Sequence, residues 1–270
     1  MLIKKVRKEH LYGVAPCLSA ILSMRRKIYK AYVNEKFQKQ LPARQDFVKV
    51  MEEMRSKDIK VVYKSKDLMN RISGNQLHQS IILSTSTLNY KQLTKKEIKP
   101  SSDKSFWLAL DRVQDPMNLG AIIRTASYFG VEKLIVTEKN SCALSPVVSK
   151  ASSGAMEWNP VHATPSMKNF LKTAVSNGFM IYGTQCSDKD SESRIINCQA
   201  VRLDKPCILV LGNEGSGLDE ETESMCHHLI NIQSSANTPN TLDSLNVSVA
   251  AGILLHALSS NRKIGAENPV

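Results

Sequence analysis

The chain has 270 residues, of which 42% are hydrophobic and 6% aromatic, a globular composition that allows one or two domains. No apolar run approaches the length of a membrane span, so we expect no membrane partner. The formal net charge of +11 is concentrated in residues 1–100, which carry 22 Lys and Arg against 8 Asp and Glu. This one-sided charge favours a nucleic acid over an anionic membrane surface as the partner.

The six cysteines are scattered, without a C-x-x-C pair or a close Cys/His pairing, as is typical of reduced thiols in an intracellular protein. His227 and His228 are adjacent, so on a strand they would point to opposite faces, and we expect no metal. The basic start of the chain lacks a secretory apolar region. It is compatible with a true start or with the trimmed end of an organellar precursor.

Residues 1–90 have the pattern of a small, alternating α/β module. We predict helices at 15–23, 44–56 and 67–72, and strands at 28–33, 61–63 and 81–83. In the helix 44–56, the residues expected to face inward are Phe47, Val48, Met51 and Met54. Residues 91–105 are rich in lysine and serine and show no periodicity, so we predict a linker there.

Residues 106–265 form the second predicted domain. The expected strands are 106–110, 133–136, 180–184, 207–211 and 229–232. The expected helices are 119–129, 145–154, 166–177, 219–225 and 247–257. Strands that alternate with helices predict a mainly parallel sheet covered on both faces, with ligands at the carboxyl ends of the strands.

Three stretches of this domain carry polar residues at loop and helix boundaries. In the first, Asn118 is placed to cap the helix that follows, and Arg124 lies on that helix beside the loop. Both residues can be explained without a functional site, Asn118 as a helix cap and Arg124 as an ordinary surface residue.

The second stretch is Gly212-Asn-Glu-Gly-Ser-Gly-Leu218, directly after the apolar run 207–211. Its spacing fits neither the dinucleotide fingerprint nor the P-loop, which argues against a nucleotide-dependent α/β enzyme. Glu214 would repel a pyrophosphate, so the loop suits a cationic or neutral ligand. Taken alone, the stretch is better explained as a glycine-rich turn without a chemical role.

The third stretch is Ser244-Leu-Asn-Val-Ser-Val-Ala250, at the start of a helix with small residues through its first half. Either Ser244 or Asn246 could cap this helix. Capping does not explain why the helix has so little side-chain volume. Small residues allow another backbone to pack very closely, which we expect here.

In this order, the three stretches resemble the three motifs of the SpoU/TrmH family of S-adenosylmethionine-dependent RNA 2′-O-ribose methyltransferases. The resemblance covers roughly residues 106–260. The stretch 10–14 and the loop around His78 and Gln79 also resemble the substrate-binding domain of that family. The resemblance implies an α/β fold, with a C-terminal SPOUT trefoil-knot domain preceded by an L30e/L7Ae-like RNA-binding domain, and an obligate homodimer whose active sites are completed across subunits.

The resemblance also implies roles for individual residues. The catalytic cluster would be Asn118, Arg124, Glu214, Ser244 and Asn246. The adenosyl group of S-adenosylmethionine would be held by Gly212, Ile232 and Leu245, with Thr184 nearby. Where the family often has Pro-Met after the isoleucine, this chain has Gln233-Ser234 and a longer insert, so we expect a different lip to the adenine pocket.

Within the family, the implied reaction is methylation of a guanosine ribose in large-subunit rRNA, in the mitochondrial matrix or in a bacterial cytoplasm. A guanidinium is effectively never deprotonated in proteins, so we expect Arg124 to hold a phosphate and the developing oxyanion rather than to act as a base. Glu214 would orient Arg124 or the ribose. The alternatives are a tRNA ribose 2′-O-methyltransferase and a non-catalytic RNA-binding ribosome assembly factor of the same fold.

Overall fold

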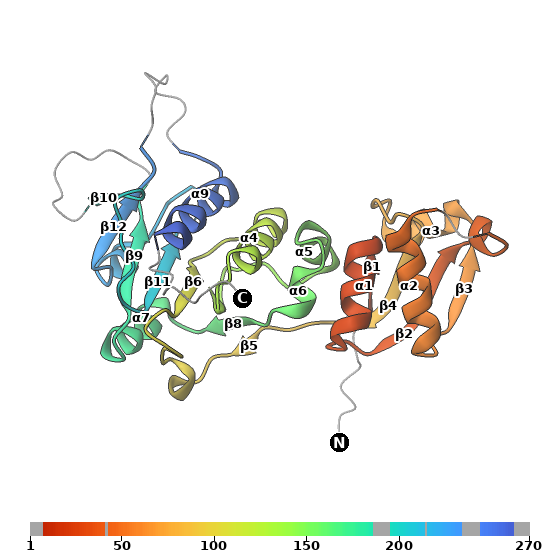
Figure 1. The fold of residues 1–270 in the computed structure, drawn as a ribbon, viewed down its shortest axis with the longest axis horizontal. Helices are drawn as coiled ribbons and strands as arrows, with labels where there is room; N and C mark the ends of the chain where they lie inside the picture. The colour runs from red at the N-terminus through yellow and green to blue at the C-terminus, as the bar shows by residue number, and fades with distance from the viewer. Residues whose placement is uncertain (1–7, 41–42, 186–194, 214, 234–243, 262–270) are drawn as a thin grey trace, which may run out of the picture. The chain divides into compact units, whose positions relative to one another are not determined.

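The computed structural model describes residues 8–40, 43–185, 195–213, 215–233 and 244–261 (Figure 1). The chain divides into two compact units. Unit 1 consists of residues 1–89 together with Ala143–Pro160, and unit 2 consists of Tyr90–Cys142 together with the chain from Val161 onward. No helix of the described part is long and apolar enough to cross a membrane.

Unit 1 contains a four-stranded mixed sheet in the order β1-β4-β2-β3. Its strands are β1 (Lys8–Tyr12), β2 (Ile28–Asn34), β3 (Val61–Lys64) and β4 (Ile81–Ser86). Its first helices are α1 (Val14–Ser23), α2 (Gln45–Ser56) and α3 (Lys66–Ser73), with a short 3-10 turn η1 (Glu35–Phe37). The alternating α/β pattern predicted from the sequence is therefore confirmed, and β1 is an additional strand.

Both faces of this sheet carry helices. On one face, α1 and α2 pack on an apolar cluster that includes Leu11, Ala31 and Leu83. On the other face, α3 packs through Met69. The inward face of α2 differs from the prediction at one position, because the core cluster contains Val50 and not Val48, while Met51 is half-buried against it.

Residues 143–160 were expected in the second domain but belong to unit 1. Instead of one helix at 145–154 they form α5 (Pro146–Ala151) and α6 (Ala155–Trp158). Gly154 separates the two helices with a φ of +84°, and a Cβ there would lie 2.9 Å from the Ala15 carbonyl oxygen. Only a glycine allows α6 to approach α1 this closely.

A buried ion pair ties α6 to the rest of unit 1. Arg26 Nε donates to Glu157 Oε2 over 2.6 Å, and Arg26 Nη2 donates to Glu157 Oε1 over 3.0 Å. The Ser149 hydroxyl donates to the same carboxylate, and Arg26 also donates to the Ser86 carbonyl and pairs with Glu9. Burial raises the pKa of Glu9, and the neighbouring Arg26 opposes that shift. Both side chains of the Arg26–Glu157 pair are completely shielded from solvent.

Unit 2 contains an eight-stranded sheet in the order β10-β12-β9-β11-β6-β7-β8-β5. Its strands are β5 (Lys91–Gln92), β6 (Phe106–Leu110), β7 (Lys133–Thr137), β8 (Val161–Thr164), β9 (Met180–Thr184), β10 (Ile195–Asn197), β11 (Cys207–Leu211) and β12 (His228–Asn231). Neighbouring strands are parallel throughout, which confirms the predicted parallel sheet.

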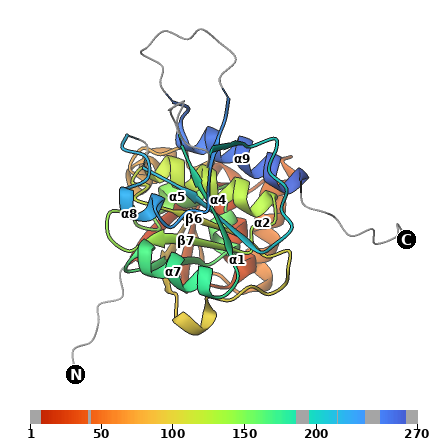
Figure 2. The same cartoon turned by 90° about the vertical axis from the view of Figure 1, so that its left-hand side faces the viewer.

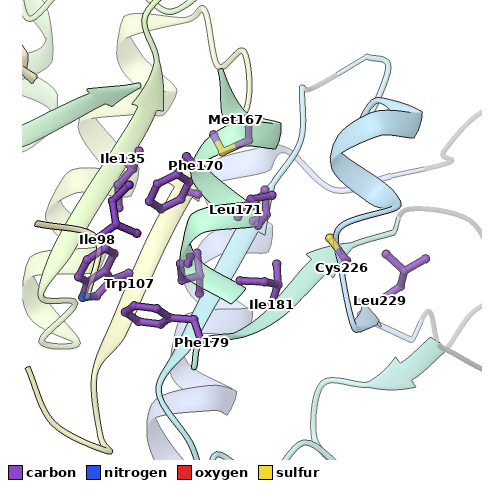
Figure 3. Packing of buried hydrophobic residues seen from close by; sticks show 14 residues of the cluster. Ile98, Trp107, Ile135, Met167, Phe170, Leu171, Phe179, Ile181, Cys226 and Leu229 are labelled. Atoms are coloured by element: carbon purple, nitrogen blue, oxygen red, sulfur yellow. The ribbon is translucent and has the colours of Figure 1, made fainter. Parts of the chain in front are cut away.

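The helices of unit 2 are α4 (Pro116–Tyr128), α7 (Met167–Ser176), α8 (Glu220–Glu223) and α9 (Val247–Ser260), with a 3-10 turn η2 (Lys95–Glu97). Figure 2 shows α4 and α9 on one side of the sheet and α7 on the other. The core on the α7 side is built around Trp107, against which Phe170 and Phe179 pack (Figure 3). Both faces of the sheet are thus covered, as the near-continuous apolar strands predict.

The expected linker 91–105 supplies the edge strand β5, and Ile98 is buried in the core, so this stretch is part of unit 2. A pattern of exposed lysines does not reveal a short edge strand, because edge strands are often charged. The trefoil knot remains a prediction, since the chain between β12 and α9 includes residues 234–243, which lie outside the described residues.

Candidate functional site

The start of α4 differs from the prediction. Asp115, not Asn118, caps the helix, and its carboxylate accepts a hydrogen bond from the Met117 N–H over 3.1 Å. Pro116 occupies the first helical position, where its missing N–H has no cost. The helix therefore begins at Pro116, three residues before the predicted start at residue 119. Asn118 lies inside the first turn instead of at the cap, so its side chain can make another contact.

That contact joins the first and third sequence motifs. The side-chain amide of Asn246 donates to Asn118 Oδ1 over 3.1 Å. Asn246 also caps α9, since its Oδ1 accepts hydrogen bonds from the Ser248 N–H over 2.9 Å and the Val249 N–H over 3.4 Å. Of the two capping candidates in the sequence, the cap is thus Asn246. Ser244 is exposed and lies two residues before it.

Arg124 lies apart from this pair. It is exposed and makes no hydrogen bond or ion pair with any described residue. It follows Asn118 by six positions, which at 100° per residue puts the two side chains about 120° apart around the helix axis. The structure therefore brings Asn118 and Asn246 together and leaves Arg124 available to a ligand or to another chain.

The glycine-rich stretch forms a closed turn at the carboxyl end of β11. The Asn213 and Gly217 backbones pair with each other over 2.9 and 3.0 Å. Asn213 Oδ1 accepts from the N–H groups of Gly215 and Ser216, and its amide donates to the Arg112 carbonyl. Glu214, the expected catalytic carboxylate of this loop, lies outside the described residues.

A contact that the sequence did not reveal holds this turn to the end of β6. Arg112 has a left-handed backbone, with a φ of +63°. Its guanidinium reaches Asp111 at 3.3 Å, the Gly217 carbonyl at 3.4 Å and Asp219 at 3.7 Å. Burial raises the pKa of Asp111, and Arg112 opposes that shift. Because Arg112 bridges segments more than 100 residues apart, spacing alone gave no signal for this role.

The expected cofactor residues meet at one edge of the sheet. Thr184 ends β9, Gly212 follows β11 and Ile232 follows β12, and these three parallel strands are neighbours in the order β12-β9-β11. Leu245, half-exposed, precedes α9. Next to Thr184, Gln185 Oε1 is buried without a hydrogen-bond partner in the described part of the chain. Sequence reasoning missed this acceptor, which an incoming donor group would satisfy.

No group of His, Cys, Asp or Glu side chains that could hold a metal ion occurs among the described residues.

Gly212 is the residue on which the turn depends sterically. A Cβ at this position would lie 2.3 Å from the Gly217 carbonyl carbon and 2.5 Å from the Leu218 nitrogen. Both contacts are with backbone, so the turn itself would have to move. We expect Gly212→Ala to lower the free energy of unfolding by about 1–3 kcal/mol, as other overpacking substitutions do.

Chemical denaturation measures this effect, and Gly215→Ala is the matched control. Among the described residues, a Cβ at Gly215, in the same turn, would meet only Asn213 Oδ1 at an ordinary 3.6 Å. Equal stability of the two variants would show that the turn is not sterically closed at Gly212.

The chain matches two protein families that divide it between them. It matches the SpoU rRNA Methylase family over residues 105–256, and the RNA 2′-O ribose methyltransferase substrate binding family over residues 10–91. The first match covers more than half of the chain and includes every predicted site residue, and the second coincides with most of unit 1.

Individual relatives agree with these matches. The protein named rRNA methyltransferase 1, mitochondrial, of Homo sapiens is 37% identical over 269 residues, which cover 97% of this chain and 75% of that protein. The 23S rRNA (guanosine-2′-O-)-methyltransferase of Coxiella burnetii is 29% identical over 96% of this chain and 98% of its own. The crystal structure of the SpoU methyltransferase AviRb from Streptomyces viridochromogenes, in complex with AdoMet, shares the fold with a TM-score of 0.72 at 19% identity, covering 94% of this chain and 89% of that one. This chain belongs to the SpoU rRNA methylase family.

Proposed function

We propose that this protein transfers the methyl group of S-adenosylmethionine to the ribose 2′-oxygen of a guanosine in large-subunit rRNA. The observation that carries the proposal is the contact between Asn118 and Asn246, which joins two of the three motifs. The guanosine target is supported by the name of the Coxiella burnetii relative. The positive charge of residues 1–100 supports an RNA substrate.

The residues at the carboxyl ends of β9, β11 and β12 fit the cofactor chemically. Gly212 brings backbone to the sheet edge without a side chain in the way, and Thr184, at the end of the neighbouring strand β9, lies between the strand ends of Gly212 and Ile232. The buried Gln185 Oε1 would accept a hydrogen bond from an amino or hydroxyl group of the bound nucleoside. We propose that these residues, with Leu245, hold S-adenosylmethionine, which when bound supplies a methyl group already activated by its sulfonium.

The remaining work of the site is alignment and charge stabilisation, because a ribose hydroxyl is a poor nucleophile. In the proposed mechanism, Asn118 and Asn246 hold the ribose through neutral hydrogen bonds, and Ser244 lies beside them. The exposed guanidinium of Arg124 binds the target phosphate and the developing oxyanion. The proton passes to phosphate or water, and Glu214 orients Arg124 or the ribose.

Cofactor binding and methyl incorporation test this proposal together. We expect S-adenosylmethionine to bind in titration calorimetry, and its labelled methyl group to appear in 2′-O-methylguanosine after complete digestion of rRNA incubated with the protein. Label in a base-methylated nucleoside would contradict the proposed reaction. Absence of both binding and transfer would favour a non-catalytic RNA-binding protein of the same fold.

We also propose that the protein works as a homodimer that buries the outer sides of α4 and α9. Tyr128 on α4 is 84% exposed, and Val249 and Ile253 on α9 are 51% and 38% exposed. A Cβ on Gly252 of α9 would meet nothing within 4 Å of the described chain, so the described residues do not form the close packing expected around this helix at Gly252. A second copy would provide it, and would bring another chain close to Arg124.

Ile253→Asp tests the dimer. A charge placed on this exposed apolar face would be buried unpaired in a dimer, so we expect the substitution to shift the mass measured by light scattering from dimer to monomer. Leu77→Asp is the matched control, because Leu77 in unit 1 is 74% exposed and lies far along the chain from α4 and α9. A wild-type protein that is monomeric at micromolar concentration would contradict the dimer.

The mitochondrial matrix is the compartment we propose, on the basis of the human relative, which is named as mitochondrial. The bacterial relative acts in a cell without that compartment. Fractionation of cells that express the protein distinguishes a mitochondrial location from a cytoplasmic one.

A further inference from the structure

One face of the unit 1 sheet is covered by a helix over only part of its length. The eight-residue helix α3 packs through Met69 on Tyr12 and Ile82, with Tyr32 at the edge of this cluster. Side chains two residues apart on a strand share a face, so this face continues along β1 to His10 and along β2 to Lys30. These two side chains are half-buried, and both lie beside Tyr32 at the edge of the α3 cluster.

Small residues lie between the two strands on this face. The central strand β4 places Ser84 opposite both His10 and Lys30, and Ser86 opposite Lys8. The pairing of β2 with β4 is irregular between Ile28 and Lys30, and the extra residue is Tyr29. Side chains from β1 and β2 can therefore meet across the serines of β4.

Side chains of β1 and β2 do meet on this face, where lysine ammonium groups lie over tyrosine rings. Lys8 Nζ on β1 lies 5.0 Å from the centre of the Tyr29 ring on β2, and Lys27 Nζ lies 5.8 Å from the same ring. Lys30 Nζ lies 5.0 Å from the centre of the Tyr32 ring. We call this surface the Lys–Tyr face: Lys8, His10, Lys27, Tyr29, Lys30 and Tyr32.

His10 completes the aromatic part of this face. Its ring lies 6.1 Å from that of Tyr32, across β4. Burial, with a smaller contribution from the charge of Lys30, lowers the pKa of His10, which favours the neutral form of its ring. The face thus presents ammonium groups beside flat aromatic rings. Proteins bind single-stranded nucleic acids with this combination: the cations bind phosphates, and unpaired bases stack on the rings.

We propose that the Lys–Tyr face binds an unpaired segment of the RNA substrate, with phosphates on Lys8, Lys27 and Lys30 and a base stacked on Tyr29. The inference rests on the proposed function, which makes RNA the substrate. Duplex RNA keeps its bases stacked inside and leaves the rings without a partner. A membrane surface would favour protruding apolar side chains, whereas both tyrosines here are half-buried on a sheet.

The test uses the full chain and a short, unstructured RNA oligonucleotide, with affinity measured by fluorescence anisotropy over a range of salt concentrations. We expect Tyr29→Leu to weaken binding roughly tenfold, because base stacking on an aromatic ring is worth about 1–3 kcal/mol. Tyr29→Phe keeps the ring and is expected to bind as the wild type does. Each of Lys8→Gln and Lys30→Gln is expected to lower the slope of log affinity against log salt by about 0.7.

Lys49→Gln is the matched control, because Lys49 is exposed on α2, which covers the opposite face of the same sheet. Unchanged affinity in Tyr29→Leu, or an equal loss in Lys49→Gln, would overturn the inference. So would a loss that is equally large for duplex RNA, or binding to anionic vesicles in place of RNA. Lys8 is exposed, so Lys8→Gln tests the face even where Tyr29→Leu fails to fold.

The two proposals fail separately in this experiment. A wild-type protein that methylates rRNA while Tyr29→Leu and Lys8→Gln bind RNA normally would contradict only the assignment of this face. A protein that loses oligonucleotide affinity in these variants, yet transfers no methyl group to any RNA, would support the face and contradict the proposed reaction.

Discussion

Arg124→Ala is expected to reduce methyl transfer to rRNA by a factor of about 10²–10³ or more, the usual effect of removing a group that stabilises charge in the transition state. The affinity for S-adenosylmethionine should stay the same, because Arg124 lies on α4 and not at the carboxyl ends of β9, β11 and β12. The folded state should be equally stable, since this side chain is exposed and makes no ion pair with any described residue. Single-turnover transfer and calorimetric cofactor binding measure the two quantities.

Two further variants separate geometry from charge. Arg124→Lys keeps the positive charge but loses the planar fork that binds two phosphate oxygens, so we expect it to recover only part of the rate. Arg202→Ala removes an exposed arginine elsewhere in unit 2 and should leave transfer unchanged. Loss of cofactor affinity in Arg124→Ala would contradict the role assigned to this residue.

Glu157→Ala is expected to destabilise unit 1 by about 3–5 kcal/mol, because it leaves the fully buried guanidinium of Arg26 without its main partner. The same carboxylate also accepts the Ser149 hydroxyl, which would lose its partner as well. The pair joins α6, from the middle of the chain, to residues near its start. Denaturant unfolding monitored in unit 1 measures the effect.

Glu52→Ala is the control for this substitution, since Glu52 is exposed on α2 of the same unit. Replacing Arg26 and Glu157 together with leucine should cost less than Glu157→Ala alone, because no unpaired charge then remains in the interior. If Glu157→Ala unfolds at the same denaturant concentration as Glu52→Ala, α6 does not hold unit 1 together through this pair.

The sequence predicted most helices and strands because their apolar periodicity is strong. The strand 207–211 and the helix that ends before Gly178 are examples, and the structure places them as β11 and α7. It did not predict where residues 143–160 pack, because an apolar helix face does not specify which of two cores it joins. The buried pair of Arg26 and Glu157 decides this, and its members are 131 residues apart.

At the candidate site, local sequence signals predict helix starts and caps, but they do not predict contacts between distant segments. The start of α4 could have been read correctly, since Asp115-Pro116 is a stronger start signal than Asn118. Asn246 was one of the two predicted caps of α9, whereas its contact with Asn118 joins positions 128 residues apart. Arg112 and Gln185 carried no sequence signal. Their roles depend on which strand ends are neighbours in the folded sheet.

Protection of rRNA from alkaline cleavage tests the central claim most directly. Alkaline hydrolysis needs a free ribose 2′-hydroxyl, so a 2′-O-methyl group protects the adjacent phosphodiester. We expect unmodified large-subunit rRNA, incubated with this protein and S-adenosylmethionine, to gain one protected position at a guanosine, and to remain unprotected with Arg124→Ala. Methyl incorporation without any protected position, or protection only in tRNA, would contradict the account.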